Sequence, residues 1–342
     1  MSTNSHTVEV ENLVKIYPGD IKAVGGINFS VGNGEFFGLL GPNGAGKSTT
    51  LKILGTLLKK TSGRVAVAGF DIDKHSMDIR RSIGFAMQEV GLDDLSTGRD
   101  FLITQGLLYD LPRSKSKARA EELLEIVGLT EAAKRKVGTY SGGMRRRLDL
   151  IGALMHSPPL LFLDEPTTGL DPQSRLAIWN HLEQLNREGI TIILTTQIME
   201  EADRLCKRIA IIDQGIIVAQ GTSKELKTDF GGDVVTLAIG TELDAGLTEK
   251  AKGLLAGREY VSEVVANGAE LTVTVRNGNA VVADLVSVLG ENQIPITNLA
   301  VSSPTLDDVF LKHTGHTIRS DSTGGDEMNQ AMKAMMGVNQ RR

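Results

Sequence analysis

A glycine-rich segment between a short apolar stretch and a helical pattern limits the possible folds of this chain more than any other feature. It matches the pattern G-x-x-x-x-G-K-[ST] and consists of Gly41, Pro42, Asn43, Gly44, Ala45, Gly46, Lys47, Ser48 and Thr49. Such glycines let backbone N–H groups turn inward around phosphate oxygens, and the positive end of the following helix faces the same charge. Lys47 can reach the β- and γ-phosphates, and the Ser48 hydroxyl can ligate Mg²⁺. An ordinary glycine turn is the alternative, but the strand before and the helix after favour a phosphate-binding loop.

Two acidic residues at the end of an apolar run form the second candidate site. Residues 160–163 are apolar and are followed by Asp164 and Glu165, which predicts a buried strand with carboxylates at its C-terminal end. Open α/β sheets bind their ligands at that end of their strands. We expect Asp164 to hold the Mg²⁺ shell and Glu165 to orient and polarise an attacking water. The acidic pair is a weak signal alone and a strong one downstream of a phosphate loop.

Strand patterns that alternate with helical patterns fill the first two thirds of the chain. The predicted strands cover residues 8–17, 26–31, 35–40, 82–88, 160–163, 191–195, 209–212 and 216–219. One helical pattern extends from Lys47 to Leu58, and another starts at Asp171, because Asp caps free N–H groups and the next residue, Pro172, suits a first turn. This alternation indicates an α/β fold. The helical stretch at about 95–156 predicts an inserted subdomain, within a first domain that spans residues 1–230.

A second, smaller domain is predicted at residues 233–313. The composition changes around residues 229–233, and Gly231 and Gly232 form a plausible linker. The following patterns have the order strand, helix, strand, strand, helix, strand, which is the split βαββαβ arrangement of α+β domains. A last short helix is predicted near Thr305. The tail at 314–342 is polar and then rich in methionine, which fits either an amphipathic helix or a frayed terminus.

Charge and composition exclude several classes of protein. The 37 Lys and Arg residues against 42 Asp and Glu residues give a formal charge of -5, which argues against a nucleic-acid-binding chain. The stretch Arg145–Arg147 is accordingly interpreted as a solvated helix face, and the scattered histidines lack metal-ligand spacing. A single cysteine, Cys206, fits a reducing compartment. No apolar run approaches the ~20 residues that cross a bilayer, so we expect a soluble chain that reaches a membrane through a partner.

The segment Tyr140-Ser141-Gly142-Gly143-Met144 gives the chain a family resemblance. It lies between the helical region and the acidic pair, and it resembles the signature of ABC transporter ATP-binding subunits, usually Leu-Ser-Gly-Gly-Gln. The chain departs from that signature at Tyr140 and Met144. The resemblance implies a P-loop NTPase fold: a RecA-like α/β core, an antiparallel β subdomain and an inserted helical subdomain. It also implies that Ser141, Gly142 and Gly143 bind ATP.

Further positions follow in the order of the same family. Tyr17 lies where the family stacks an aromatic ring on adenine, although a lone Tyr could equally belong to the core. Gln88 ends a predicted strand, where the family's glutamine meets Mg²⁺ and contacts the membrane subunits. The family resemblance also assigns Asp171 to the D-loop at the ATP site. Gln197 occupies the switch position, which usually holds histidine, and is expected to act in catalysis with Lys47 and Glu165.

The end of the second domain narrows the resemblance to one subfamily of ABC transporter ATP-binding subunits. Residues 303–315 resemble the ending of daunorubicin/doxorubicin-resistance type ATPase subunits, a subfamily in which Gln at the switch position is familiar. This resemblance implies a homodimer that hydrolyses ATP with Mg²⁺ at two composite sites. It further implies a separate integral membrane permease, a place on the cytoplasmic face of the cell membrane, and export of a drug-like or lipid-like compound.

Three other functions compete with that hypothesis. ABC proteins that act on nucleic acid or on the ribosome typically carry two cassettes and basic linkers. ABC proteins of DNA repair carry a long coiled-coil insertion. The sequence has none of these features. The serious alternative is a regulatory ABC module with little or no hydrolysis, because Met144 and Gln197 are unusual. The presence of Lys47, Asp164 and Glu165 argues against it.

Overall fold

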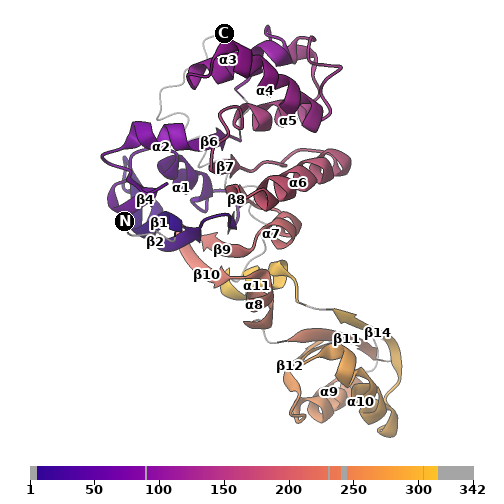
Figure 1. Ribbon diagram of the computed structural model, residues 1–342. Helices are drawn as coiled ribbons and strands as arrows, with labels where there is room; N and C mark the ends of the chain where they lie inside the picture. Colours follow the sequence, from indigo (N-terminus) through magenta and orange to yellow (C-terminus); the bar gives the residue numbers. More distant parts are fainter. Residues whose placement is uncertain (1–5, 89–90, 230–231, 240–244, 303, 315–342) are drawn as a thin grey trace. The chain divides into compact units, whose positions relative to one another are not determined.

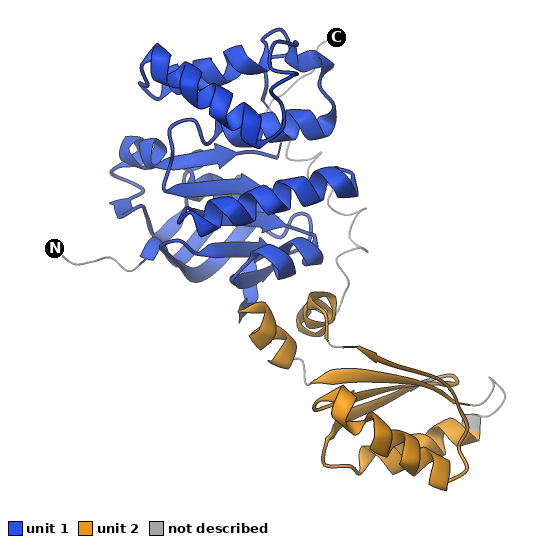
Figure 2. Ribbon diagram, turned by 45° about the vertical axis from the view of Figure 1, so that its right-hand side comes forward, with its two compact units in different colours: residues 1–220, 318–342 blue, residues 221–317 orange. Residues whose placement is uncertain are grey.

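The computed structural model describes residues 6–88, 91–229, 232–239, 245–302 and 304–314. They form two compact units, shown in different colours in Figure 2, and the division between the units falls between residues 220 and 221. Each unit has its own buried apolar cluster. Among the described residues, no helix combines the length and the apolar character needed to cross a membrane.

A largely parallel sheet forms the centre of the first unit (Figure 1). Its strands have the order β10-β9-β3-β8-β7-β6, and they are β3 (Phe36–Leu40), β6 (Ile83–Ala86), β7 (Leu160–Asp164), β8 (Thr191–Thr196), β9 (Arg208–Asp213) and β10 (Ile216–Gly221). The pairs β9-β3, β3-β8, β8-β7 and β7-β6 are parallel. Every residue of β3, β7 and β8 is buried, as expected for parallel strands covered on both faces.

A second, antiparallel sheet carries the N-terminal part of the unit. Its order is β2-β1-β4-β5, with β1 (His6–Tyr17), β2 (Ile21–Gly32), β4 (Ser62–Val67) and β5 (Phe70–Asp71). The sequence patterns missed β4, β5 and the following helix α2 (Ser76–Ser82). Helix α1 (Lys47–Leu54) also ends earlier than predicted. The helix stops because Thr56 adopts a left-handed backbone with φ of 60°, a conformation that a helix does not continue through.

The predicted helical subdomain consists of α3 (Gly98–Leu108), α4 (Arg113–Ile126), the short 3-10 helix η1 (Val137–Thr139) and α5 (Gly142–Gly152). These helices gather at one end of the first unit (Figure 1). Helix α5 begins at Gly142, because the Ser141 hydroxyl accepts a hydrogen bond from the Met144 N–H and caps the helix. Helix α6 (Pro172–Arg187) starts as predicted, with Asp171 as its cap, and α7 (Met199–Leu205) follows β8.

The second unit has the predicted alternation of strands and helices. It contains α8 (Ser223–Asp229), β11 (Asp233–Ile239), α9 (Ala245–Ala256), β12 (Val261–Asn267), β13 (Glu270–Val275), α10 (Gly278–Glu291), β14 (Ile296–Ser302) and α11 (Leu306–Thr314). The sheet order is β12-β13-β11-β14, and all its pairs are antiparallel. The division into units falls before α8, whereas the boundary predicted from the sequence at residue 230 falls after it.

The separate core of the second unit leads to a first prediction. Leu237 of β11 is fully buried in that core, whereas its neighbour Thr236 lies on the other face and is half-buried. We expect Leu237→Ala to lower the free energy of unfolding of the second unit by about 2–5 kcal/mol, because it leaves a cavity. Thr236→Ala is the control and should cost much less. Urea unfolding followed by circular dichroism measures both, and equal losses in the two variants would contradict the assignment of the core face.

Candidate nucleotide-binding site

The glycine-rich loop connects β3 to α1 and is shaped by close backbone contacts. The Gly41 N–H donates to the Thr196 carbonyl at 3.2 Å. A Cβ atom at Gly41 would lie 2.1 Å from the Ile212 carbonyl oxygen, and one at Gly46 would lie 2.4 Å from that of Ala23. Gly46 also has a left-handed backbone with φ of 100°. Both positions therefore require glycine for steric reasons.

The turn between β9 and β10 supports this loop through main-chain atoms. The Gly215 N–H donates to the Ala45 carbonyl at 3.0 Å, and the Gly215 carbonyl accepts from the Gly25 N–H at 2.7 Å. Gly215 has φ of 79°, and a Cβ atom there would lie 2.9 Å from the Ala23 carbonyl oxygen. One residue thus joins the phosphate loop to strand β2 of the antiparallel sheet.

The predicted lysine is buried against the loop and against the acidic pair. Lys47 is 3% exposed, and its Nζ donates to the carbonyls of Gly41 and Pro42 at 2.8 Å each. The same atom lies 3.5 Å from Glu165 Oε1. Burial lowers the pKa of Lys47, and the Glu165 carboxylate opposes that shift. The ammonium is therefore held between backbone oxygens and one carboxylate, at the position where it can meet phosphate charge.

Glu165 is oriented from both sides of its carboxylate. The Gln88 amide and the Thr168 hydroxyl each donate to Oε2 at 3.1 Å, opposite the oxygen that faces Lys47. The Glu165 N–H donates to Thr195 in β8, and its backbone is left-handed with φ of 47°. Strained backbone at a polar, buried residue is typical of functional sites. Gln88 itself lies two residues beyond the end of β6, which stops at Ala86 and not at Gln88 as predicted.

The oxygen atoms around Asp164 fit the predicted Mg²⁺ site. Asp164 ends β7 and is buried, and its Oδ1 accepts from the Ser48 hydroxyl at 2.8 Å and from the Thr195 hydroxyl at 2.6 Å. Mg²⁺ prefers oxygen ligands and keeps several waters. Ser48 and Asp164 are close enough to share one ion, and Gln88 reaches the same cluster through Glu165.

The other predicted residues lie at separate places around the loop. Tyr17 is half-buried at the end of β1, and its hydroxyl lies 3.5 Å from that of Thr49. Gln197 directly follows β8. Asp171 is exposed and caps α6, while Ser141 caps α5. In the part of the chain that the structure describes, no hydrogen bond or ion pair joins the segment Ser141–Gly143 to the phosphate loop.

Several residues of the site were missed by sequence reasoning. Thr195 and Thr168 bind the acidic pair, and Glu201 in α7 is fully buried. The Glu201 Oε1 accepts from the Thr167 hydroxyl at 2.6 Å and from the Trp179 indole at 2.9 Å, and burial raises its pKa. Helical spacing could have indicated Glu201, because it shares the buried face of α7 with Ala202 and Leu205.

The interpretation of residues 145–147 as a solvated helix face is wrong for Arg146, which is buried, whereas Arg145 and Arg147 are half-buried. Arg146 is only 6% exposed, and Arg147 donates to the Val127 carbonyl at 2.8 Å. Arg145 forms an ion pair with Asp94. The physical reason is that each guanidinium meets carbonyl or carboxylate oxygens supplied by distant segments, which a run of like charges does not reveal.

Comparisons with known proteins agree with this geometry. The family model for ABC transporters matches residues 24–168, and the model for the C-terminal domain of DrrA1-3-like ATP-binding proteins matches residues 221–314. The linearmycin resistance ATP-binding protein LnrL of Bacillus subtilis is 41% identical over 315 residues, covering 91% of this chain and 99% of that protein. The daunorubicin resistance ATP-binding protein DrrA2 of Streptomyces coeruleorubidus is 39% identical over 324 residues, covering 95% and 99%.

A solved structure extends the comparison to the fold. The dimeric, post-hydrolysis ATP-binding cassette MJ0796, bound to ADP and Pi, matches with a TM-score of 0.59 and 29% identity, covering 63% of this chain and 98% of that one. The fold and the loop therefore define a P-loop NTPase of the cassette type, which confirms the predicted fold class. More narrowly, the chain belongs to the ABC transporter ATP-binding proteins that carry a DrrA-like C-terminal domain.

The role of the β9–β10 turn gives a second prediction. We expect Gly215→Ala to weaken the binding of a fluorescent ATP analogue, because the new Cβ displaces the backbone that supports the phosphate loop. Gly189→Ala is the matched control: Gly189 also has positive φ, of 98°, but nothing lies within 4 Å of its Cβ position. Both variants carry backbone strain of about 1–3 kcal/mol. Equal affinities for the analogue in the two variants would contradict the supporting role.

Proposed function

We propose that this chain is the ATP-hydrolysing subunit of an ABC transporter that exports a drug-like or lipid-like compound through a separate membrane permease. The observation that carries the proposal is the cluster beside the phosphate loop in which the buried side chains of Lys47 and Glu165 meet, with Gln88 bound to Glu165 at its edge. Relatives named for resistance to linearmycin and daunorubicin support an export role. The subunit acts at the cytoplasmic face of the cell membrane, where the permease binds it.

In this proposal the cluster divides the chemistry among its residues. Glu165 orients and polarises the attacking water, and its carboxylate is well placed for this because both oxygens are held by neighbours. Lys47 neutralises charge on the β- and γ-phosphates. Ser48, Asp164 and, partly through water, Gln88 would hold Mg²⁺, which would supply further charge neutralisation when bound. Catalysis is then positioning together with electrostatic stabilisation of the transferred phosphoryl group.

The proposal also assigns residues to the adenine ring and to the nucleotide site of a second copy of the chain. Tyr17, beside Thr49, stacks on the adenine ring. The chain carries one phosphate loop and one Ser141–Gly143 segment, so that segment and Asp171 serve the nucleotide of a second copy in a head-to-tail homodimer. The MJ0796 cassette, which is dimeric and bound to ADP and Pi, supports this arrangement. The start of α5 suits the task, because helix N-termini bind anions.

Glu165→Gln should nearly abolish ATP turnover and preserve nucleotide binding, because the amide keeps the shape but cannot polarise water as a carboxylate does. Phosphate release and titration with a fluorescent ATP analogue measure the two properties. Glu200→Gln, the same change at an exposed position of α7, is the control and should leave turnover unchanged. Lys47→Ala should lose both binding and turnover.

Two outcomes would count against the proposed function. Wild-type protein without measurable turnover, even with its permease, would favour the regulatory module. Unchanged turnover in Glu165→Gln would remove Glu165 from its catalytic role.

Gln197 is proposed to donate a hydrogen bond to the γ-phosphate from the end of β8. A neutral amide can donate but does not titrate near neutral pH. Gln197→Ala should therefore reduce turnover by ~10²–10³-fold, the usual cost of one such donor. Gln197→His should retain activity and acquire a pH dependence near the ordinary histidine pKa of ~6.5. Steady-state rates against pH measure this. The control is Gln184→Ala on the exposed face of α6, and a Gln197→Ala variant that matches it would exclude the switch role.

A further inference from the structure

Arg146 of α5 binds three backbone carbonyls from two other parts of the first unit. Its Nε donates to the Pro166 carbonyl and one terminal nitrogen donates to the Asp164 carbonyl, both at 2.8 Å. The other terminal nitrogen donates to the Met87 carbonyl and lies 3.3 Å from Asp149 on the next turn of α5. All three guanidinium nitrogens are therefore used, and the side chain is 6% exposed.

These contacts complete a closed ring of bonded groups that includes the proposed catalytic carboxylate of Glu165. Met87 directly precedes Gln88, and Pro166 directly follows Glu165. The Gln88 amide donates to the Glu165 carboxylate at 3.1 Å on one side of the ring. Arg146 bridges the two backbones on the other side. The relative position of Gln88 and Glu165 is thus fixed twice, once by their own side chains and once by the guanidinium.

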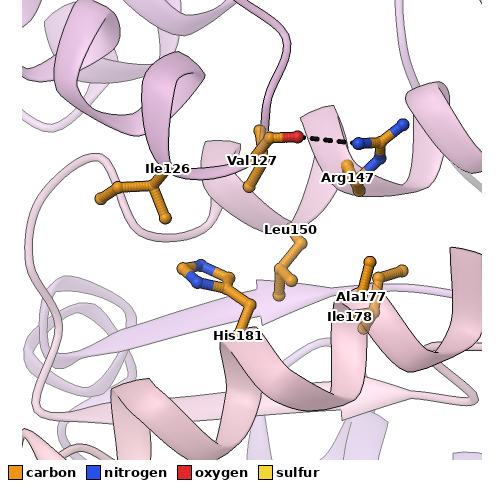
Figure 3. A pocket seen from close by; sticks show the side chains of 7 residues that line it. All are labelled: Ile126, Val127, Arg147, Leu150, Ala177, Ile178 and His181. Carbon is orange, nitrogen blue, oxygen red and sulfur yellow. Dashed lines mark hydrogen bonds between the residues drawn. The ribbon is translucent and has the colours of Figure 1, made fainter.

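The side chains around α5 do not fill all the space beside the helix. Where α5 faces α4 and α6, a pocket of about 70 Å³ remains, lined by residues that include Val127, Leu150 and His181 (Figure 3). Arg147 lines the same pocket and donates to the Val127 carbonyl (Figure 3). It also donates to the Gly143 carbonyl, so both of these acceptors lie within the helical subdomain. Arg146, by contrast, does not line this pocket; it reaches the end of β7 and the residue before Gln88, so it joins α5 to the two segments that carry the site.

We propose that Arg146 is a positioning residue for ATP hydrolysis: it fixes Glu165 and Gln88 relative to each other through their neighbouring backbones. The inference rests on the proposed function, because it concerns the same reaction. It assigns no contact between Arg146 and the nucleotide. Lysine cannot replace it fully, because an ammonium is a compact point charge, whereas the planar guanidinium presents N–H groups in fixed, divergent directions.

The test separates turnover from binding. We expect Arg146→Lys to lower kcat by at least ~10-fold while KM and the affinity for a fluorescent ATP analogue change by less than ~2-fold, the pattern of an interaction needed only in the transition state. Arg146→Gln should be slower still. The control is Arg99→Lys, because Arg99 joins α3 to α4 through an ion pair with Glu121 and touches none of the site. Its kcat should remain within ~2-fold of wild type.

A double variant tests the route of the effect. If Arg146 acts by positioning Gln88, then Arg146→Lys combined with Gln88→Ala should be hardly slower than the slower single variant, since residues that act through one another are not additive. Multiplying effects would overturn this route. If Arg146→Lys does not fold by circular dichroism, Asp149→Asn decides: a fall in kcat of ~3-fold or more at unchanged KM supports the proposal, and an unchanged kcat overturns it.

The outcomes also distinguish this inference from the proposed function. Wild-type turnover that Glu165→Gln abolishes, together with an Arg146→Lys variant as fast as wild type, would overturn only the positioning role. Parallel losses of stability, binding and kcat in Arg146→Lys would reduce Arg146 to a structural residue and would equally overturn the inference. A wild-type protein without turnover would remove the proposed function itself.

Discussion

The parallel pairing of β3, β8 and β7 is the constraint on which the rest of the site depends. Leu40 pairs with Thr196, and Asp164 pairs with Thr195, so the carboxyl ends of three neighbouring strands meet at one edge. The phosphate loop, the acidic pair and the proposed switch residue follow from those ends. Because every side chain of the three strands is buried, a shift of register by one residue would not be tolerated. The sheet therefore sets the spacing of the polar groups before any of them contacts another.

At this edge the protein buries charge, and each charge is matched. Lys47 faces Glu165, Arg146 faces Asp149 and three carbonyls, and Asp164 accepts two hydroxyl donors. Buried polar groups that are fully hydrogen-bonded rigidify a structure, whereas removing one partner leaves an uncompensated group at high cost. Single substitutions in this network are thus expected to disturb more than the residue changed. For this reason the isosteric variants and the paired controls matter for interpreting any kinetic result.

The sequence was sufficient for the features whose signal is local. The loop at Gly41–Thr49, the acids at the end of β7 and the start of α6 at Asp171 each follow from a short run of residues with a clear physical role. The strands β4 and β5 were missed because both strands are short and only partly buried, and the segment 62–71 that holds them includes a turn. Arg146 and Thr195 could not be assigned to the site from local pattern, since their partners lie in distant segments. Gln88 was placed in a strand, although it lies beyond the end of β6. Long-range hydrogen bonds are the part of the site that the periodicity of the sequence cannot predict.

The main-chain link through Gly215 has a consequence for how such a chain can diverge in evolution. Ala45 and Gly25 take part in it with backbone atoms only, so the link does not depend on the side chain at position 45. At Gly215 the positive φ and the nearby Ala23 carbonyl make any residue with a Cβ atom unfavourable. Backbone geometry at a few glycines therefore limits which substitutions the loop tolerates, and the side-chain chemistry of their neighbours matters less. Descendants of this chain can change much of the surface around the nucleotide and still keep the loop in place, provided that those glycines persist.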